Sequence, residues 1–286
     1  MKFVFILSLI YITSLVIVQS TTIDFSNSGT GYTVSGNVVT ITSAGSYDLA
    51  GTVTDKNIVV SASCTLNLNS LSLTNSGSLT PILISSSQTV TMSLSGSSTL
   101  VDSSTNSNDG TIYLQSGASL TISGTGTLNI TPNKLMAING TDSTSLTVND
   151  GPTINIQSSS TNAGGVYLRT AVTFNNAKFT YSGTNGENHA IDSEGTVKIV
   201  KGTYTLTAGS GKGIQSENYL IIGEENGSDS DLKLTITTAN EGIEAKKIEI
   251  YSGTITIDAS EDGMNAHHLV QIVMTLYNVL EIVPAI

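Results

Sequence analysis

The sequence predicts an all-β chain folded as a solenoid of about nine coils. The phrase Glu-Gly-Ile-Glu-Ala at residues 241–245 returns 21 residues later as Asp-Gly-Met-Asn-Ala at residues 262–266. Two short segments with alternating apolar side chains, residues 247–250 and 254–257, lie between the copies and are joined by a glycine turn. Helical periodicity is nearly absent outside the two termini. A phrase that returns after about 20–30 residues, with only strands and turns between its copies, is typical of a β-solenoid.

The apolar residue of the phrase marks every coil and serves as a landmark. The intervals between successive landmarks are 24, 30, 26, 28, 25, 23, 29 and 21 residues, which predicts one turn of the coil each time, with loops of variable length. The landmarks are Ile58, Ile82, Ile112, Ile138, Val166, Ile191, Ile214, Ile243 and Met264.

After most landmarks the chain repeats one order of elements: a short strand, a glycine turn and a second strand. The expected strand pairs include residues 119–122 with 127–130, 197–199 with 203–206, and 247–250 with 254–257. Side chains alternate between the two faces of a strand, so Ile255 and Ile257 are expected to point inward. By the same alternation Cys64 faces the core beside Leu66 and Leu68, and a single cysteine excludes an internal disulfide.

The chain divides into three parts. Residues 1–20 combine Lys2, an apolar run and a small-residue site ending at Ser20, which predicts a secretory signal peptide and an extracellular or cell-surface protein. Residues 21–266 form the predicted solenoid as one domain. In residues 267–286 the glycine turns disappear. A truncated gene model, an apolar cap over the last coil and a short membrane anchor are the three explanations for this segment.

The charge of the chain limits the classes of partner that it is expected to bind. The formal net charge is −11, and 15 of the 22 acidic residues lie after residue 185. The chain has one arginine, Arg169, and no basic patch, which argues against nucleic acid as a partner. Sequons at Asn129, Asn139 and Asn226 would be glycosylated only in a eukaryotic secretory pathway, giving a glycoprotein. We expect a monomer.

Three segments resemble a known family. They are residues 45–60 (GSYDLAGTVTDKNIVV), residues 123–130 (SGTGTLNI) and the repeated phrase, where Glu261 and Asp262 precede Gly-Met. They resemble secreted carbohydrate-binding right-handed parallel β-helices, a family with a polysaccharide-lyase-like fold whose type member is a clostridial cell-surface protein. The resemblance covers residues 41–266. It implies binding of cellulose-like or acidic plant polysaccharides, calcium held in the scaffold, and no firm catalytic activity.

Residues directly after the landmarks are expected to form an outward-facing column. From Ile112 onward this column reads Tyr113, Asn139, Tyr167, Asp192, Gln215, Glu244 and Asn265. Tyr113 and Tyr167 are two coils apart, about 9.6 Å, which is close to the disaccharide repeat of an extended β-linked glucan. Aromatic faces give apolar contact to sugar rings, so we expect Tyr113, Tyr167 and Asn139 to contact carbohydrate.

Acidic side chains at the end of this column predict a calcium site. Calcium takes six to eight oxygen ligands, which corner loops of stacked coils can supply. The expected ligands are Asp192, Glu241, Glu244, Asp258, Glu261 and Asp262. The alternative is a solvated acidic face with Lys246 and Lys247 as counterions. A chain this acidic should repel a polyuronate unless calcium bridges the two.

Two other function classes stay open. A lyase would need a basic residue near a bound uronate, and no spacing selects one of the candidates, which are Arg169, Lys198, Lys201 and Lys212. Thr-x-Thr pairs suggest a surface adhesin or an ice-binding face. The pairs are expected to skip several coils, however, which favours ordinary outward-facing strand residues. The sequence favours a non-catalytic polysaccharide-binding protein.

Overall fold

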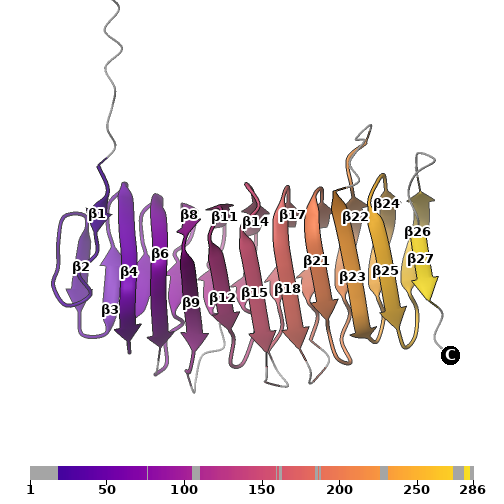
Figure 1. Ribbon diagram of the computed structural model, residues 1–286. Helices are drawn as coiled ribbons and strands as arrows, with labels where there is room; N and C mark the ends of the chain where they lie inside the picture. The colour runs from indigo at the N-terminus through magenta and orange to yellow at the C-terminus, as the bar shows by residue number, and fades with distance from the viewer. Residues whose placement is uncertain are drawn as a thin grey trace, which may run out of the picture.

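The protein is a rod of stacked coils built from β-strands, seen in a computed structural model (Figure 1). The structure describes residues 19–272 and 280–283, except residues 76, 105–109, 159, 161–162, 184–185, 187 and 226–230. The predicted β-solenoid is confirmed, with about eight turns and almost all strands paired in parallel. The described part of the chain contains no helix that could span a membrane. Most of the predicted signal peptide lies outside the described residues.

The solenoid has three faces, each a parallel β-sheet. The landmark ladder forms the first of them. Every landmark pairs with the landmark of the next coil, from Ile58 with Ile82 to Ile243 with Met264. The ladder consists of β3 (Val38–Ile41), β5 (Asn57–Val60), β7 (Ile82–Ile84), β10 (Ile112–Leu114), β13 (Ile138–Gly140), β16 (Val166–Leu168), β19 (Ile191–Ser193) and the first parts of β22 (Ile214–Ile222), β24 (Ile243–Ile250) and β26 (Met264–Ile272).

The second face follows the first corner of each coil. It consists of β1 (Thr21–Thr22), β4 (Ser46–Thr54), β6 (Cys64–Asn75), β8 (Thr89–Ser95), β11 (Ser119–Gly124), β14 (Ser145–Val148), β17 (Ala171–Phe174), β20 (Thr196–Ile199) and the second parts of β22, β24 and β26. The predicted strands at residues 119–122, 197–199 and 247–250 are confirmed in β11, β20 and β24.

The third face lies toward the viewer in Figure 1. It consists of the second parts of β4 and β6, then β9 (Ser97–Asp102), β12 (Thr127–Thr131), β15 (Thr153–Ser158), β18 (Ala177–Gly183), β21 (Gly202–Thr207), β23 (Leu232–Ala239), β25 (Thr254–Ala259) and β27 (Leu280–Val283). At the N-terminal end of the rod, β2 (Tyr32–Ser35) forms an antiparallel hairpin with β3.

Alternate side chains of all three faces fill the inside of the coil. The landmarks from Ile58 to Ile243 are fully buried, as are Ile255 and Ile257, and Cys64 is buried as predicted. Phe174 packs edge-on against Phe179 and Tyr204, with ring centroids 5.1 and 5.5 Å apart. Like side chains stacked on successive coils give a continuous apolar core without a disulfide.

Glycine precedes several landmarks because the coils approach closely there. A Cβ added to Gly213 would lie 2.5 Å from Ile236 Cγ2 and 2.6 Å from Gly242 O. At Gly242 it would lie 2.5 Å from Gly263 O and would also clash with Ile257. The backbone bonds across this corner, such as Ile214 N to Gly242 O at 3.0 Å, require that approach. The Gly-apolar pair of the repeated phrase is therefore a packing requirement.

Three of the Thr-x-Thr pairs lie on successive coils, where Thr205 pairs with Thr235 and Thr235 with Thr256. One sequence expectation about the ladders is wrong. The coil order continues past Ala266, because β26 pairs with β24 as far as Ile272 and β27 pairs with β25. A strand of this segment can join the ladder through its backbone N–H and C=O groups without a glycine turn before it. The three explanations for the origin of residues 267–286 stay predictions.

Substituting Gly242 by alanine should destabilise the solenoid. The added methyl group has no space between Ile257 and Gly263, so we expect the free energy of unfolding to fall by about 1–3 kcal/mol in urea titrations. Thr125→Ala, in the exposed turn between β11 and β12, is the control and should change stability by less than about 0.5 kcal/mol. Equal stability of the two variants would contradict this account of the phrase.

Candidate functional site

Residues that follow the landmarks form one outward-facing column. Each is paired with its neighbour on the next coil: Tyr113, Asn139, Tyr167, Asp192, Gln215, Glu244 and Asn265. All seven are partly exposed, whereas the landmarks beside them from Ile112 to Ile243 are buried. The geometry of the predicted column is confirmed. Tyr113 and Tyr167 lie two coils apart, about 9.6 Å at the usual strand spacing.

A groove opens over the middle of the column. It has a volume of about 400 Å³ and is lined by Leu135, Met136, Asn139, Tyr167, Asn188, His189 and Asp192. Two of the three predicted carbohydrate contacts, Asn139 and Tyr167, therefore share one groove with Asp192. The third, Tyr113, is paired with Asn139 on the preceding coil and does not line the groove. The groove combines apolar walls with amide, phenol, imidazole and carboxyl groups.

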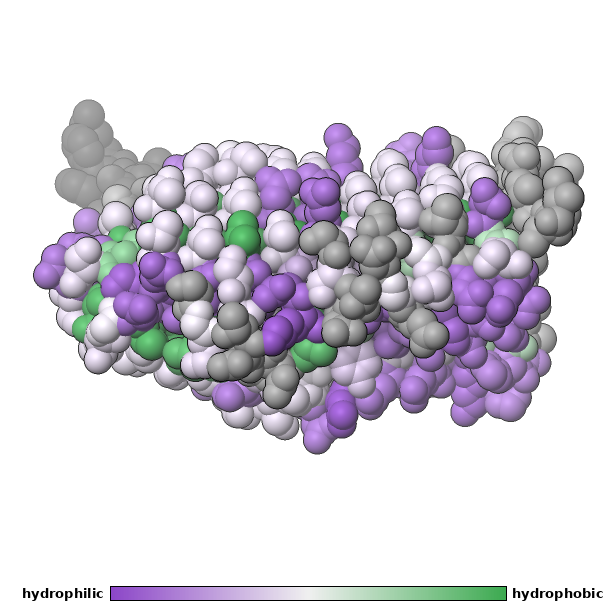
Figure 2. Space-filling model, turned by 90° about the horizontal axis from the view of Figure 1, so that it is seen from below, coloured by the Kyte–Doolittle hydropathy of each residue, from purple (hydrophilic) through white to green (hydrophobic). Residues whose placement is uncertain are grey.

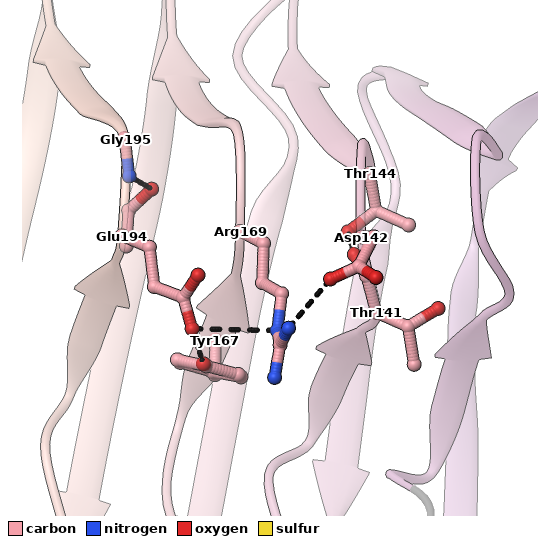
Figure 3. A network of polar contacts seen from close by, with 8 residues as sticks. Thr141, Asp142, Thr144, Tyr167, Arg169, Glu194 and Gly195 are labelled. Atoms are coloured by element: carbon pink, nitrogen blue, oxygen red, sulfur yellow. Dashed lines mark hydrogen bonds and ion pairs between the residues drawn. The ribbon is translucent and has the colours of Figure 1, made fainter.

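Tyr167 is held by a network that joins three coils (Figure 3). Its hydroxyl donates to Glu194 Oε1 at 2.5 Å, and Arg169 Nε lies 3.3 Å from the same oxygen. Arg169 Nη1 lies 2.5 Å from Asp142 Oδ1. Asp142, Arg169 and Glu194 each follow their landmark strand by one or two residues, so the coil repeat brings them together. Burial, followed by the bond to Glu194, raises the pKa of Tyr167 to about 12, so the phenol stays a donor.

A second charged network borders the groove around Lys212. Its Nζ lies 3.2 Å from Glu241 Oε2 and makes a close ion pair with Glu244 Oε2. Glu244 Oε1 also lies 2.9 Å from His267 Nε2. The backbone N–H of Lys212 donates to His189 Nδ1 at 2.9 Å. Burial and the charge of Lys212 lower the pKa of His189 to about 4, so the imidazole in the groove is neutral.

The sequence contained a signal for this network that the landmark column alone does not show. Met136, His189, Lys212 and Glu241 each stand two residues before a landmark. This position forms its own row at the entry to the ladder, where Ala190 N donates to Lys212 O and Gly213 N donates to Glu241 O, each at 3.1 Å. Reading two columns together, rather than one, would have placed Lys212 beside Glu241 and Glu244.

Asp192, the acidic residue that lines the groove, has a strongly raised pKa. Burial, then the charges of Glu217 and Glu194, raise its pKa from 3.8 to about 7, while the charge of Lys212 opposes the shift. The carboxyl group therefore exists in both protonation states near neutral pH. In its protonated form it can donate a hydrogen bond as well as accept one.

A second hollow continues the column toward the C-terminus. It has a volume of about 520 Å³ and is lined by Gln215, Ser216, Glu217, Glu244, Lys246, His267 and His268. Figure 2 shows hydrophilic side chains gathered toward the C-terminal coils, at the right of the view. This agrees with the excess of acidic residues after residue 185.

The expected calcium ligands do not gather into one site. Glu241 and Glu244 are paired with Lys212, Asp192 lines the groove, and the remaining three expected ligands, Asp258, Glu261 and Asp262, are exposed. Within the described residues no group of three histidine, cysteine, aspartate or glutamate side chains could hold a metal ion. Calcium binding stays a prediction, which thermal melts in calcium and in chelator would test.

The three sequons have different surroundings. Asn129 donates from Nδ2 to Ser97 Oγ at 3.3 Å and accepts from Asn155 at 3.0 Å, so its amide is part of a ladder between coils. Asn139 lies in the groove, and Asn226 lies outside the described residues. Glycosylation stays a prediction.

The fold and the groove define a class of protein: an elongated β-solenoid with a partly apolar, partly polar groove along one outer face. Residues 35–278 match the family described as carbohydrate-binding domain-containing protein, and the chain belongs to this family. Membership of the family indicates that the protein binds carbohydrate. No curated protein and no solved structure shows significant similarity to the chain.

Replacing Asp192 by asparagine should stabilise the protein at high pH. A carboxyl group with a raised pKa favours folding fully below pH 3.8, and this contribution is lost as the pH rises to about 7. Asp192→Asn should therefore be more stable than wild type at pH 8 by roughly 1–3 kcal/mol, and close to wild type at pH 4.

Urea unfolding at both pH values measures this difference. Asp258→Asn is the matched control, because Asp258 is exposed and should show no such dependence. A gain for Asp192→Asn that is the same at pH 4 and pH 8 would show that burial does not perturb the carboxyl group.

Proposed function

We propose that this is an extracellular, non-catalytic protein that binds polysaccharide along the column over the landmark ladder. The observation that carries the proposal is the shared groove of Asn139 and Tyr167, with Leu135 and Met136 as apolar walls. Sugar rings have apolar faces and hydroxyl edges, so they require both kinds of contact in one site. Family membership supports carbohydrate as the ligand.

The repeat of the solenoid suits a polymer rather than a single sugar. Tyr113 and Tyr167 stand on alternate coils, with Asn139 paired between them. The spacing of about 9.6 Å between alternate coils is close to two residues of an extended β-linked glucan. Gln215 and the second hollow extend the same line toward the C-terminus. A long chain can therefore lie along the rod and contact several coils.

The state of two of the four candidate bases, Lys212 and Arg169, supports binding without chemical change. Lys212 is engaged by Glu241 and Glu244, and Arg169 is engaged by Asp142 and Glu194. Neither cation is presented to the groove as a general base for β-elimination. Hydrogen bonding to Asp142, the largest cause, raises the pKa of Arg169 further, which makes this residue a poorer base. The predicted signal peptide at residues 1–20 supports an extracellular location.

Truncating both aromatic residues of the column should weaken binding. Tyr113→Ala with Tyr167→Ala should lower affinity for insoluble neutral β-glucan roughly 100-fold, because each ring contributes about 1.5 kcal/mol of apolar contact. Pull-down isotherms measure the change. Wild type should release no reducing ends and no unsaturated products in the same samples.

Tyr219→Ala is the matched control for this double variant. Tyr219 is an exposed tyrosine on the second face, 41% accessible, and lies away from the groove. Its removal should leave binding unchanged. Pull-down that the double variant retains in full would refute the proposed site, and product release would refute a non-catalytic role.

A further inference from the structure

In the described part of the chain two cations border the groove, and each is neutralised by a pair of carboxylates. Arg169 lies between Asp142 and Glu194, at 2.5 and 3.3 Å. Lys212 lies between Glu241, at 3.2 Å, and Glu244. The seven described residues that line the groove include no lysine or arginine, and the exposed Lys134, just before Leu135, is not among them.

The lysine clamp, meaning Lys212 with Glu241 and Glu244, is shielded from water. The side chains are 21%, 16% and 15% exposed, and the Oε2 atoms of both glutamates are buried. Charges in such surroundings interact more strongly than on an open surface. An incoming sugar carboxylate would have to displace two intramolecular carboxylates from Lys212. It would also meet Asp192, with Glu194 and Glu217 near enough to act on that carboxyl group.

We infer that the groove selects uncharged glycans over uronates, and that Glu241 and Glu244 set this selectivity by neutralising Lys212. This inference rests on the proposed function and names its substrate class. Removing the two glutamate charges leaves a single ammonium group beside the groove. That group could then pair with the carboxylate of a uronate, as it now pairs with Glu241 and Glu244.

The test compares wild type with the variant Glu241→Gln plus Glu244→Gln. Both are assayed by pull-down and by affinity electrophoresis at pH 8 in EDTA, with neutral β-glucan and with polygalacturonate as probes. EDTA removes bridging metal ions from the comparison. Wild type should bind only the neutral polymer. The variant should gain affinity for polygalacturonate of at least about tenfold relative to its own affinity for neutral β-glucan, and added salt should reduce the gain.

Two controls make the gain specific to the lysine clamp. Glu249→Gln plus Asp258→Asn removes the same number of charges and frees Lys247, whose Nζ lies 2.5 Å from Glu249 Oε1 away from the groove. This control should gain nothing. Adding Lys212→Met to the test variant should abolish the gain. If the double variant does not fold, as judged by its thermal melt, Glu244→Gln alone carries the test.

The outcomes separate this inference from the proposed function. Wild type that binds polygalacturonate as well as neutral glucan would overturn the selectivity and leave polysaccharide binding intact. An absent gain in the variant, or an equal gain in the Glu249 and Asp258 control, would overturn the role of the clamp. Wild type that binds neither polymer would overturn the proposed function together with this inference.

Discussion

Parallel backbone pairing between coils is the constraint on which the rest of this structure depends. Each landmark pairs with the landmark of the next coil, and this register is kept from Ile58 to Met264 although the loops differ in length. Gly213 and Gly242 make the close approach possible, because even a methyl group would clash there. Once the register is set, inward side chains stack into the core and outward side chains stack into columns.

The candidate site follows from the same register. Asn139, Tyr167 and Asp192 are far apart in sequence and become neighbours because each stands one residue after a landmark. Their charged supports arise in the same way at the ends of the strands and at the entry to the ladder. The arginine network and the lysine clamp each join residues of successive coils, so they tie coils together while they shape the groove. Contacts that join the coils and residues of the proposed binding groove thus lie on the same face.

The sequence was sufficient for the fold and for the column, because spacing and a period of two are one-dimensional signals. The sequence did not predict which cations form ion pairs with the acidic residues. Glu241 and Glu244 looked like calcium ligands when counted as oxygens, but Lys212 reaches both from the preceding coil. Residues 267–286 were not expected to belong to the solenoid because their side-chain pattern changes, while their backbone still pairs as far as Ile272 and again in β27. Neither backbone pairing nor a side-chain contact between coils produces a pattern within a single segment of the sequence.

Mapping the residues that a glycan contacts would test most directly whether the outward column is the binding face. NMR spectra of the protein labelled on its tyrosine rings, titrated with a neutral β-glucan oligosaccharide, would report each aromatic residue separately. We expect the Tyr113 and Tyr167 resonances to shift together, with one apparent Kd, while Tyr219 and Tyr251 stay unchanged. Shifts confined to Tyr219 and Tyr251, with the column silent, would contradict it.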